Sequence, residues 1–178
     1  MPKRILTSER VFTGLIFNVD RDLLLEDDGR EVTREVVRHP GGSGGLPVFT
    51  DGTVALVRQY RHPAGRELLE IPAGRIEEGE TPEQCAQREI EDETASRPER
   101  LEKLAEFYST PGFCAEKLYV YLATQLRPSS QSLDHDERLN VVRMPFKEAL
   151  ALVHSGEIED SKTIVALLLA EPRLKSLV

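Results

Sequence analysis

The stretch that decides the fold is Gly74–Ser96, which reads GRIEEGETPEQCAQREIEDETAS. It predicts a short loop and then a helix from about Pro82 to about Ala95. Thr81 suits the N-cap of this helix, and Pro82 suits its first position. Gln84 stands where a capping box requires Glu or Gln. No further proline or glycine interrupts the segment, so nothing in the sequence breaks the helix before its end.

The same stretch is dense in acidic side chains. Eight of the 21 residues from Gly74 to Thr94 are Asp or Glu, and such crowding repels itself unless water or cations neutralise it. Glu89 and Glu93 are four residues apart, so their Cβ atoms are expected about 5–6 Å apart on one helix face. A hard divalent cation, Mg²⁺ or Mn²⁺, would turn this repulsion into a ligand set. The acid pair by itself leaves two interpretations open, a metal site and a solvated acidic face, and it favours the second.

The wider pattern resembles the signature sequence of the Nudix hydrolases. The shared positions are Gly74, then Glu80 after five residues, then Arg88-Glu89-Ile90-x-Asp92-Glu93 after seven more. Three positions differ from that family: Asp92 replaces Glu, Ala95 replaces Gly, and Ser96 replaces an aliphatic residue. None of these differences removes a central ligand, so the resemblance implies an active enzyme.

The composition limits the class of protein. A chain of 178 residues with 39% hydrophobic content is long enough for one main domain with its own core. The net charge of −8 argues against a nucleic-acid partner. No stretch approaches the roughly 20 apolar residues of a membrane span, and the start lacks a secretory signal, so we expect a cytoplasmic protein that does not bind membranes. Cys85 and Cys114 are expected to be reduced thiols.

Three regions are predicted along the chain. Residues 1–40 form a small antiparallel β-sheet, with a hairpin turn at Asp28-Gly29. Residues 41–45, Gly-Gly-Ser-Gly-Gly, are interpreted as a flexible hinge, because they lack the Lys-Ser/Thr of a phosphate-binding loop. Residues 46–178 form the main domain, an α+β fold with a mixed sheet and helices packed on its faces. Strands are expected at 46–50 and 53–60 as a hairpin, then at 67–71, 101–108, 118–126 and 139–144, with helices at 146–153 and 164–170. The resemblance makes this domain a Nudix-type α/β/α sandwich.

The flanks of the signature resemble one subfamily, the ADP-ribose pyrophosphatases. Residues 65–80, GRELLEIPAGRIEEGE, and residues 109–117, STPGFCAEK, carry this resemblance. It implies hydrolysis of ADP-ribose to AMP and ribose 5-phosphate with Mg²⁺, or Mn²⁺, as the cofactor. It also implies a homodimer in which the N-terminal sheet crosses over to help bind the nucleoside diphosphate sugar.

The resemblance further assigns individual residues. It implies metal ligation by the backbone carbonyl of Ala73 and by Glu89, Glu93 and Glu137, and a bracing ion pair between Glu80 and Arg88. The residues that it implies for substrate binding are Arg34, Arg61, Arg75, Thr110, Pro111, Gly112 and Glu116. Arg38 competes with Arg34 for the contact from the partner subunit. Without the resemblance, the sequence favours a different role for Arg61, as a charged residue that keeps an edge strand soluble.

The general base is left open between neighbouring residues of one loop. Alignment on the strand from Leu139 places Glu137 at the loop ligand and His135 where some relatives carry a catalytic Glu. A histidine can serve as a base near neutral pH. The alternative, that His135 is an exposed loop residue and Asp136 or Glu137 acts as the base, is favoured.

Three rival functions compete with hydrolysis of ADP-ribose. The closing stretch from Met144 also resembles GDP-mannose pyrophosphatases, and the nucleoside preference cannot be derived from these residues. A sensor that binds ADP-ribose without cutting it is a rival of another class, and the intact Glu89 and Glu93 argue against it. Processing of nucleic-acid ends is disfavoured by the acidic balance and the lack of a basic stripe.

Overall fold

The computed structural model describes residues 4–133 and 138–174, and it divides the chain into two compact units. The first unit is Met1–Gly41 with Phe107–Lys117, and the second is Gly42–Glu106 with Leu118–Val178. Within the described residues, no helix has both the length and the apolar character needed to cross a membrane.

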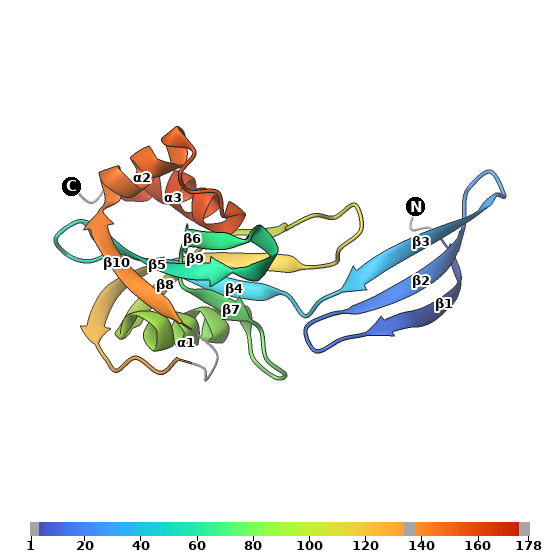
Figure 1. The fold of residues 1–178 in the computed structure, drawn as a ribbon, viewed down its shortest axis with the longest axis horizontal. Coiled ribbons are helices and arrows are strands. Elements are labelled where there is room, and N and C mark those ends of the chain that lie inside the picture. Colours follow the sequence, from blue (N-terminus) through green and yellow to red (C-terminus); the bar gives the residue numbers. More distant parts are fainter. Residues whose placement is uncertain (1–3, 134–137, 175–178) are drawn as a thin grey trace. The chain divides into compact units, whose positions relative to one another are not determined.

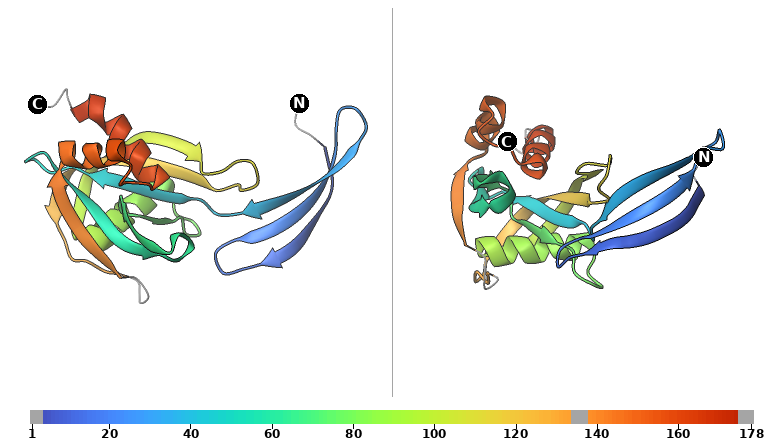
Figure 2. Two further views of the ribbon diagram at one scale, coloured as in Figure 1. Left: turned by 45° about the horizontal axis from the view of Figure 1, so that its top comes forward. Right: turned by 45° about the vertical axis from the view of Figure 1, so that its right-hand side comes forward.

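The first unit is built on a three-stranded antiparallel sheet (Figure 2). Its strands are β1 (Arg4–Thr13), β2 (Asn18–Leu25) and β3 (Glu31–Arg38), in the order β1-β2-β3. The β2–β3 turn contains Gly29 with φ of +84°, a conformation that glycine adopts without a steric penalty, so the predicted hairpin is confirmed. The loop between β8 and β9 joins this sheet, because Val37 donates to the Phe113 carbonyl and accepts from Ala115 N at 2.8 and 2.9 Å.

The second unit contains two sheets. One has the order β10-β5-β6, and the other has the order β7-β4-β9-β8. In the larger sheet β4 is parallel to β9 and antiparallel to β7, so this sheet is mixed, as predicted. The strands are β4 (Gly42–Pro47), β5 (Thr53–Arg61), β6 (Arg66–Glu70), β7 (Ala73–Arg75), β8 (Ser96–Tyr108), β9 (Lys117–Pro128) and β10 (Leu139–Pro145).

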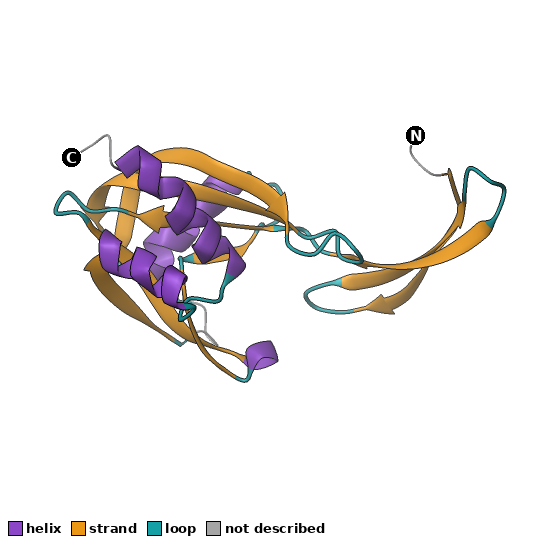
Figure 3. Ribbon diagram, turned by 90° about the horizontal axis from the view of Figure 1, so that it is seen from above, coloured by secondary structure: helices purple, strands orange, loops and turns teal. Residues whose placement is uncertain are grey.

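Helices cover both sides of these sheets. Helix α1 (Pro82–Thr94) lies on one side, and α2 (Phe146–Ser155) and α3 (Ser161–Leu174) lie on the other (Figures 1 and 3). A single 3₁₀ turn, His62–Ala64, joins β5 to β6. The fully buried core side chains include Leu46, Leu56, Ile71, Ile90, Val120, Ile158 and Leu167. The predicted α+β sandwich with an N-terminal antiparallel sheet is therefore confirmed.

The glycine run differs from the sequence prediction. Gly42–Pro47 is strand β4, buried at all six positions, and not a loop. A side chain on Gly44 would overlap Ala73, and a Cβ on Gly45 would lie 2.9 Å from Cδ1 of Ile90. The glycines therefore let the neighbouring backbone and α1 approach β4 closely. A glycine-rich composition is equally typical of a close approach and of a flexible hinge, so the sequence alone does not distinguish them.

The second predicted hairpin is also only partly present. The turn at Asp51-Gly52 exists, with Phe49 N donating to the Thr53 carbonyl at 2.9 Å. A single bridge between Val48 and Val54 replaces the expected ladder. The reason is that β4 pairs with β7 and β9 in the larger sheet, while β5 pairs with β6 and β10 in the other.

Candidate active site

The helix that carries the acidic pair begins where the sequence predicts. Thr81 Oγ1 accepts from Gln84 N at 3.2 Å, and Gln84 Oε1 accepts from Thr81 N at 2.9 Å, so the capping box is complete. Pro82 occupies the first turn, where its missing N–H is not needed. The helix ends at Thr94, and its C-cap residue Ala95 has left-handed backbone with φ of +52°.

Glu89 and Glu93 face the interior of the second unit. They are 7% and 1% exposed, and they share the buried side of α1 with Ile90. A solvated acidic face is therefore excluded for this pair. Burial of carboxylates is costly unless cations or donors compensate it. Arg88 supplies part of this compensation, because its Nη1 donates to Glu89 Oε1 at 2.5 Å.

Strand β7 lies directly against one of these carboxylates. A Cβ on Gly74 would overlap the carboxylate of Glu89, and even the farther oxygen, Oε2, would lie 2.8 Å from it. Ala73 precedes Gly74 in the same strand, in register with Gly44 of β4. The structure thus places the backbone of Gly74 against the carboxylate of Glu89, and metal ligation by the Ala73 carbonyl stays a prediction.

The predicted brace between the loop and the helix is present. Arg88 donates through Nε to Oε1 and through Nη2 to Oε2 of Glu80, at 2.9 and 3.0 Å. Glu80 Oε2 also accepts from Glu77 N at 3.1 Å. The hydrogen bond from Arg88 holds the pKa of Glu80 below its usual value. Because Nη2 of Arg88 further reaches the Arg75 carbonyl at 3.3 Å, this arginine links the loop, β7 and Glu89.

Arg61 has a partner that the sequence did not indicate. Its Nε and Nη2 donate to the two carboxylate oxygens of Glu70, at 2.7 and 2.8 Å. This hydrogen bond raises the pKa of Arg61 despite partial burial, and the charge of Glu93 acts in the same direction. The side chain of Arg61 remains 39% exposed, and its contact with the diphosphate stays a prediction.

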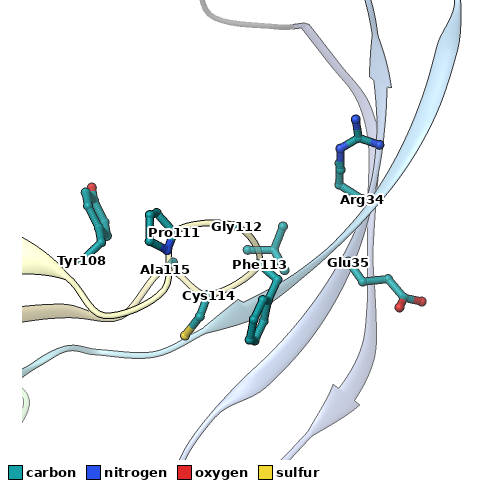
Figure 4. A pocket seen from close by; sticks show the side chains of 9 residues that line it. Arg34, Glu35, Tyr108, Pro111, Gly112, Phe113, Cys114 and Ala115 are labelled. Atoms are coloured by element: carbon teal, nitrogen blue, oxygen red, sulfur yellow. The ribbon is translucent and has the colours of Figure 1, made fainter. Parts of the chain in front are cut away.

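Several other predicted residues surround a pocket of about 300 Å³ within the first unit. Arg34 lines it from β3, and the loop after β8 supplies the opposite wall (Figure 4). The side chain of Arg38 is 41% exposed and is held by Asp20 and Asp22 at 3.0 and 2.9 Å, whereas that of Arg34 is 56% exposed and lies 4.0 Å from Glu26. These contacts favour Arg34 over Arg38 as the residue available to a ligand. The remaining lining residues are Glu35, Val36, Tyr108, Pro111, Gly112, Phe113, Cys114 and Ala115.

Thr110 and Glu116 also belong to the first unit. The Thr110 carbonyl accepts from Cys114 N at 3.1 Å and so closes the turn that contains Pro111 and Gly112. Glu116 Oε1 lies 3.5 Å from Nδ1 of His39. The structure thus groups Arg34 with the Thr110–Glu116 loop in one unit, and Ala73, Arg75, Glu89 and Glu93 in the other.

Comparison with known proteins identifies the family. Residues 38–167 match the family model of the NUDIX domain. The chain belongs to the Nudix family. The ADP-ribose pyrophosphatase of Bacillus subtilis (strain 168) is 38% identical over 173 residues, which cover 94% of this chain and 91% of that protein. The resemblance to Nudix hydrolases and to ADP-ribose pyrophosphatases is therefore confirmed.

Other relatives of this Nudix chain carry different names. The methanol dehydrogenase activator of Bacillus methanolicus is 34% identical, over 92% of this chain and 90% of that protein. The GDP-mannose pyrophosphatase of Yersinia pestis (strain Pestoides F) is 34% identical, over 83% of this chain and 80% of that protein. A crystal structure of an ADP compounds hydrolase superposes with a TM-score of 0.86 at 25% identity, covering 99% of this chain and 96% of that one.

The donor set of the Nudix helix suits a hard cation. Among residues 4–133 and 138–174, no group of three or more His, Cys, Asp or Glu side chains is arranged to hold a metal ion. What the helix offers is two buried carboxylates from one face, Glu89 and Glu93. Mg²⁺ is usually held by one or two protein carboxylates together with substrate phosphates, so this pair fits it. Cys85 does not compete as a ligand, because burial raises the pKa of its thiol to about 12.

The predicted ligand Glu137 and the candidate base His135 lie outside the described residues. The segment just before them is hydrogen-bonded to the end of the Nudix helix. Gln131 Nε2 donates to the Glu93 carbonyl at 2.7 Å, and Ser132 N donates to the Asp92 carbonyl at 3.0 Å. Helix ends leave such carbonyls without intrahelical partners. No sequence signal identifies this contact, because any polar segment can supply these donors.

Proposed function

We propose that this Nudix hydrolase cleaves the pyrophosphate bond of ADP-ribose and releases AMP and ribose 5-phosphate in a reaction that depends on Mg²⁺, or on Mn²⁺. The observation that carries the proposal is the buried acidic pair, Glu89 and Glu93, packed against the Gly74 backbone. The ADP-ribose pyrophosphatase of Bacillus subtilis and the ADP compounds hydrolase support the substrate class, because both match nearly the whole chain.

The residues that would hold the cation are Glu89, Glu93, Glu137 and the backbone carbonyl of Ala73. When bound, a divalent cation neutralises diphosphate charge and lowers the pKa of a coordinated water. Arg88 keeps the carboxylate of Glu89 oriented through its 2.5 Å hydrogen bond, and Glu80 fixes Arg88 in turn. Such preorganised groups contribute to catalysis because they need no rearrangement as charge develops.

Binding of the sugar nucleotide falls to two sets of residues in this proposal. Arg61 and Arg75 contact the diphosphate, since guanidinium groups match the geometry of phosphate oxygens. Arg34 reaches the substrate from the partner subunit of a homodimer. Thr110, Pro111, Gly112 and Glu116 complete the binding surface.

A homodimer is supported by apolar side chains that the first unit exposes. Leu15 is 99% exposed and Ile16 is 61% exposed, at the tip of the β1–β2 hairpin, and Phe12 is 50% exposed beside them. Exposed apolar clusters often mark interaction surfaces. Light scattering at working concentration tests this: the mass of a dimer is expected, and the mass of a monomer contradicts the proposed assembly.

The general base is proposed to come from residues 134–137, with Glu137 favoured over His135. His135→Asn separates the two, because Glu137 is also a proposed metal ligand and Glu137→Gln should lose activity in either case. Loss of at least roughly a hundredfold in kcat is expected for the residue that acts as the base, since general base catalysis contributes about 10²–10⁴-fold. A large effect of His135→Asn would assign the base to the histidine, and a small effect would leave Glu137 as the base.

A second candidate substrate is GDP-mannose, because the GDP-mannose pyrophosphatase of Yersinia pestis covers most of the chain. Incubation with each sugar nucleotide, with Mg²⁺ or with chelator, tests both functions. Chelator-sensitive release of AMP and ribose 5-phosphate, with slower turnover of GDP-mannose, is expected. A preference for GDP-mannose moves the assignment to that substrate, and binding of ADP-ribose without turnover favours a sensor.

We also propose a cytoplasmic localisation, because both cysteines are free and would stay reduced there.

A further inference from the structure

A buried ion cluster lies beside the acidic site, within the second unit. Its centre is Glu70, the last residue of β6, which is 0% exposed. One side of its carboxylate accepts the fork of Arg61, at 2.7 and 2.8 Å, and Oε2 also accepts from Nζ of Lys162. Arg61 and Lys162 together outweigh the burial of Glu70 and hold its pKa below the usual value, so this carboxylate is charged.

The backbone next to Glu70 is anchored from a distant part of the chain. Ile71 N donates to Thr163 Oγ1 at 2.8 Å, although 92 residues separate them. Thr163 is fully buried, and its hydroxyl donates in turn to Asp160 Oδ2 at 2.5 Å. The end of β6 is therefore fixed to the start of α3, immediately before the Pro72-Ala73-Gly74 segment. Because the backbone beside Glu70 is held in place, its carboxylate can define the position of the side chain that it binds.

Lys162 occupies a place that a cation does not favour. It is the second residue of α3, where the positive end of the helix dipole opposes a positive charge. Asp160 at 2.8 Å and Glu70 compensate it. Two carboxylates, Glu70 and Asp160, therefore face two cations, Arg61 and Lys162, and Lys162 anchors Glu70 in addition to Arg61. The side chain of Arg61 is 39% exposed, so part of its guanidinium remains available to an anion.

We propose that Glu70 is a positioning residue, which holds Arg61 in a preset orientation for the diphosphate while Lys162 holds the carboxylate of Glu70 in place. This inference rests on the proposed function, in which Arg61 contacts the diphosphate. Removal of a buried ion pair in favour of apolar packing is often neutral or stabilising, so stability alone gives a weak reason for this cluster. Preorganisation of a phosphate-binding arginine gives a specific reason, because less freedom is lost on binding.

The test is a set of kinetic comparisons with a built-in control for folding. Arg61→Ala removes the contact, Glu70→Gln removes the charge of the anchor, and Glu70→Asp keeps the charge but retracts it by one methylene. Arg143→Lys is the matched control, since Arg143 also donates to a carboxylate, that of Asp51 at 2.8 Å, outside the cluster. Thermal unfolding by circular dichroism sets the assay temperature at which every variant is folded. If Glu70→Gln does not fold, Glu70→Asp carries the test.

Arg61→Ala is expected to raise KM at least about tenfold, because it removes one charge-assisted hydrogen bond to the diphosphate. Glu70→Gln should raise KM roughly five- to tenfold and Glu70→Asp about threefold, with kcat within about twofold, because the diphosphate is bound similarly before and during reaction. In the Arg61→Ala background, either change at Glu70 should alter KM by less than about twofold, since coupled residues are not additive. A purely structural role would instead give the same effect in both backgrounds.

Two results overturn the inference while leaving the proposed function intact: KM within about twofold of wild type for both Glu70 variants, or effects that are additive with Arg61→Ala. If the wild-type protein turns over no sugar nucleotide, the proposed function fails. The same variants are then compared by calorimetric titration of ADP-ribose in chelator. Weakened binding in the Glu70 variants that disappears in the Arg61→Ala background supports the positioning role, and unchanged or absent binding overturns it.

Discussion

Replacement of Gly74 by alanine tests the geometry of the acidic site most directly. The new Cβ would overlap the carboxylate of Glu89, and the farther oxygen would lie 2.8 Å away, against 3.4 Å for an ordinary contact. The carboxylate must therefore move by more than half an ångström, and its nearer oxygen by more. A displacement near 1 Å in a catalytic constellation costs about a hundredfold in rate. Overpacking of this kind destabilises a protein by about 1–3 kcal/mol.

The assay for Gly74→Ala is steady-state hydrolysis of ADP-ribose together with urea unfolding. A drop in kcat/KM of roughly a hundredfold is expected. Gly52→Ala serves as the control, because Gly52 has φ of +79° and a Cβ added to it would meet nothing within 4 Å. It should lose about 1 kcal/mol from left-handed strain and keep full activity. Activity of Gly74→Ala within threefold of wild type would show that Glu89 has no fixed position against β7, and it would refute the reasoning.

Three further predictions address the Nudix helix and its brace. Glu93→Gln should keep the fold, lose at least about a hundredfold in kcat and lose the Mg²⁺-dependent rise in melting temperature of the wild type; a loss below tenfold removes Glu93 from the metal site. Ala95→Gly should raise the free energy of unfolding by about 1 kcal/mol, because φ at Ala95 is +52°, and a lower urea midpoint contradicts this. Glu80 has a depressed pKa in the folded state, so its pairing with Arg88 stabilises the fold above the ordinary pKa of 4.5 and is lost as pH falls through the lower folded value. Urea midpoints of wild type and Glu80→Gln should therefore converge as the pH is lowered from 5 toward 3, and a constant difference would contradict the pairing.

Local signals in the sequence were enough to predict the helix and the relation of its two acids. The capping box at Thr81 and Gln84 and the absence of breakers define the start and course of α1, and both depend on neighbours within four residues. The spacing of Glu89 and Glu93 puts them on one face of any helix. Whether that face meets solvent or protein depends on β4 and β7, which lie elsewhere in the sequence, so their burial was not predictable.

The missed features share a dependence on distant contacts. Gly42–Pro47 has few of the β-branched and aromatic residues that favour strands, and it is a strand because β7, β9 and α1 surround it. The pairing of Arg61 with Glu70 does not follow from the β5–β6 register, which places Arg61 opposite Arg66 and Glu70 opposite Val57. Neither strand alone indicates that the last side chain of β6 turns toward the last side chain of β5. The anchoring of Ile71 by Thr163 spans 92 residues and has no local signal.

The glycines of β4 and β7 and the acidic pair of α1 are two parts of one arrangement. Helix α1 approaches β4 at Gly45, where a Cβ would lie 2.9 Å from Ile90, and it approaches β7 at Gly74, where a Cβ would overlap Glu89. Ser43 fixes this approach, because its hydroxyl donates to the Pro82 carbonyl at 2.6 Å. Close packing removes water from the carboxylates. This strengthens their attraction for a cation, and it also raises the energetic cost of the two carboxylates when no cation compensates them. In the proposed cation site the glycines would contribute to affinity without touching the ion, and for this reason substitutions at Gly45 and Gly74 should weaken Mg²⁺ binding, measured by calorimetric titration, even where the fold survives.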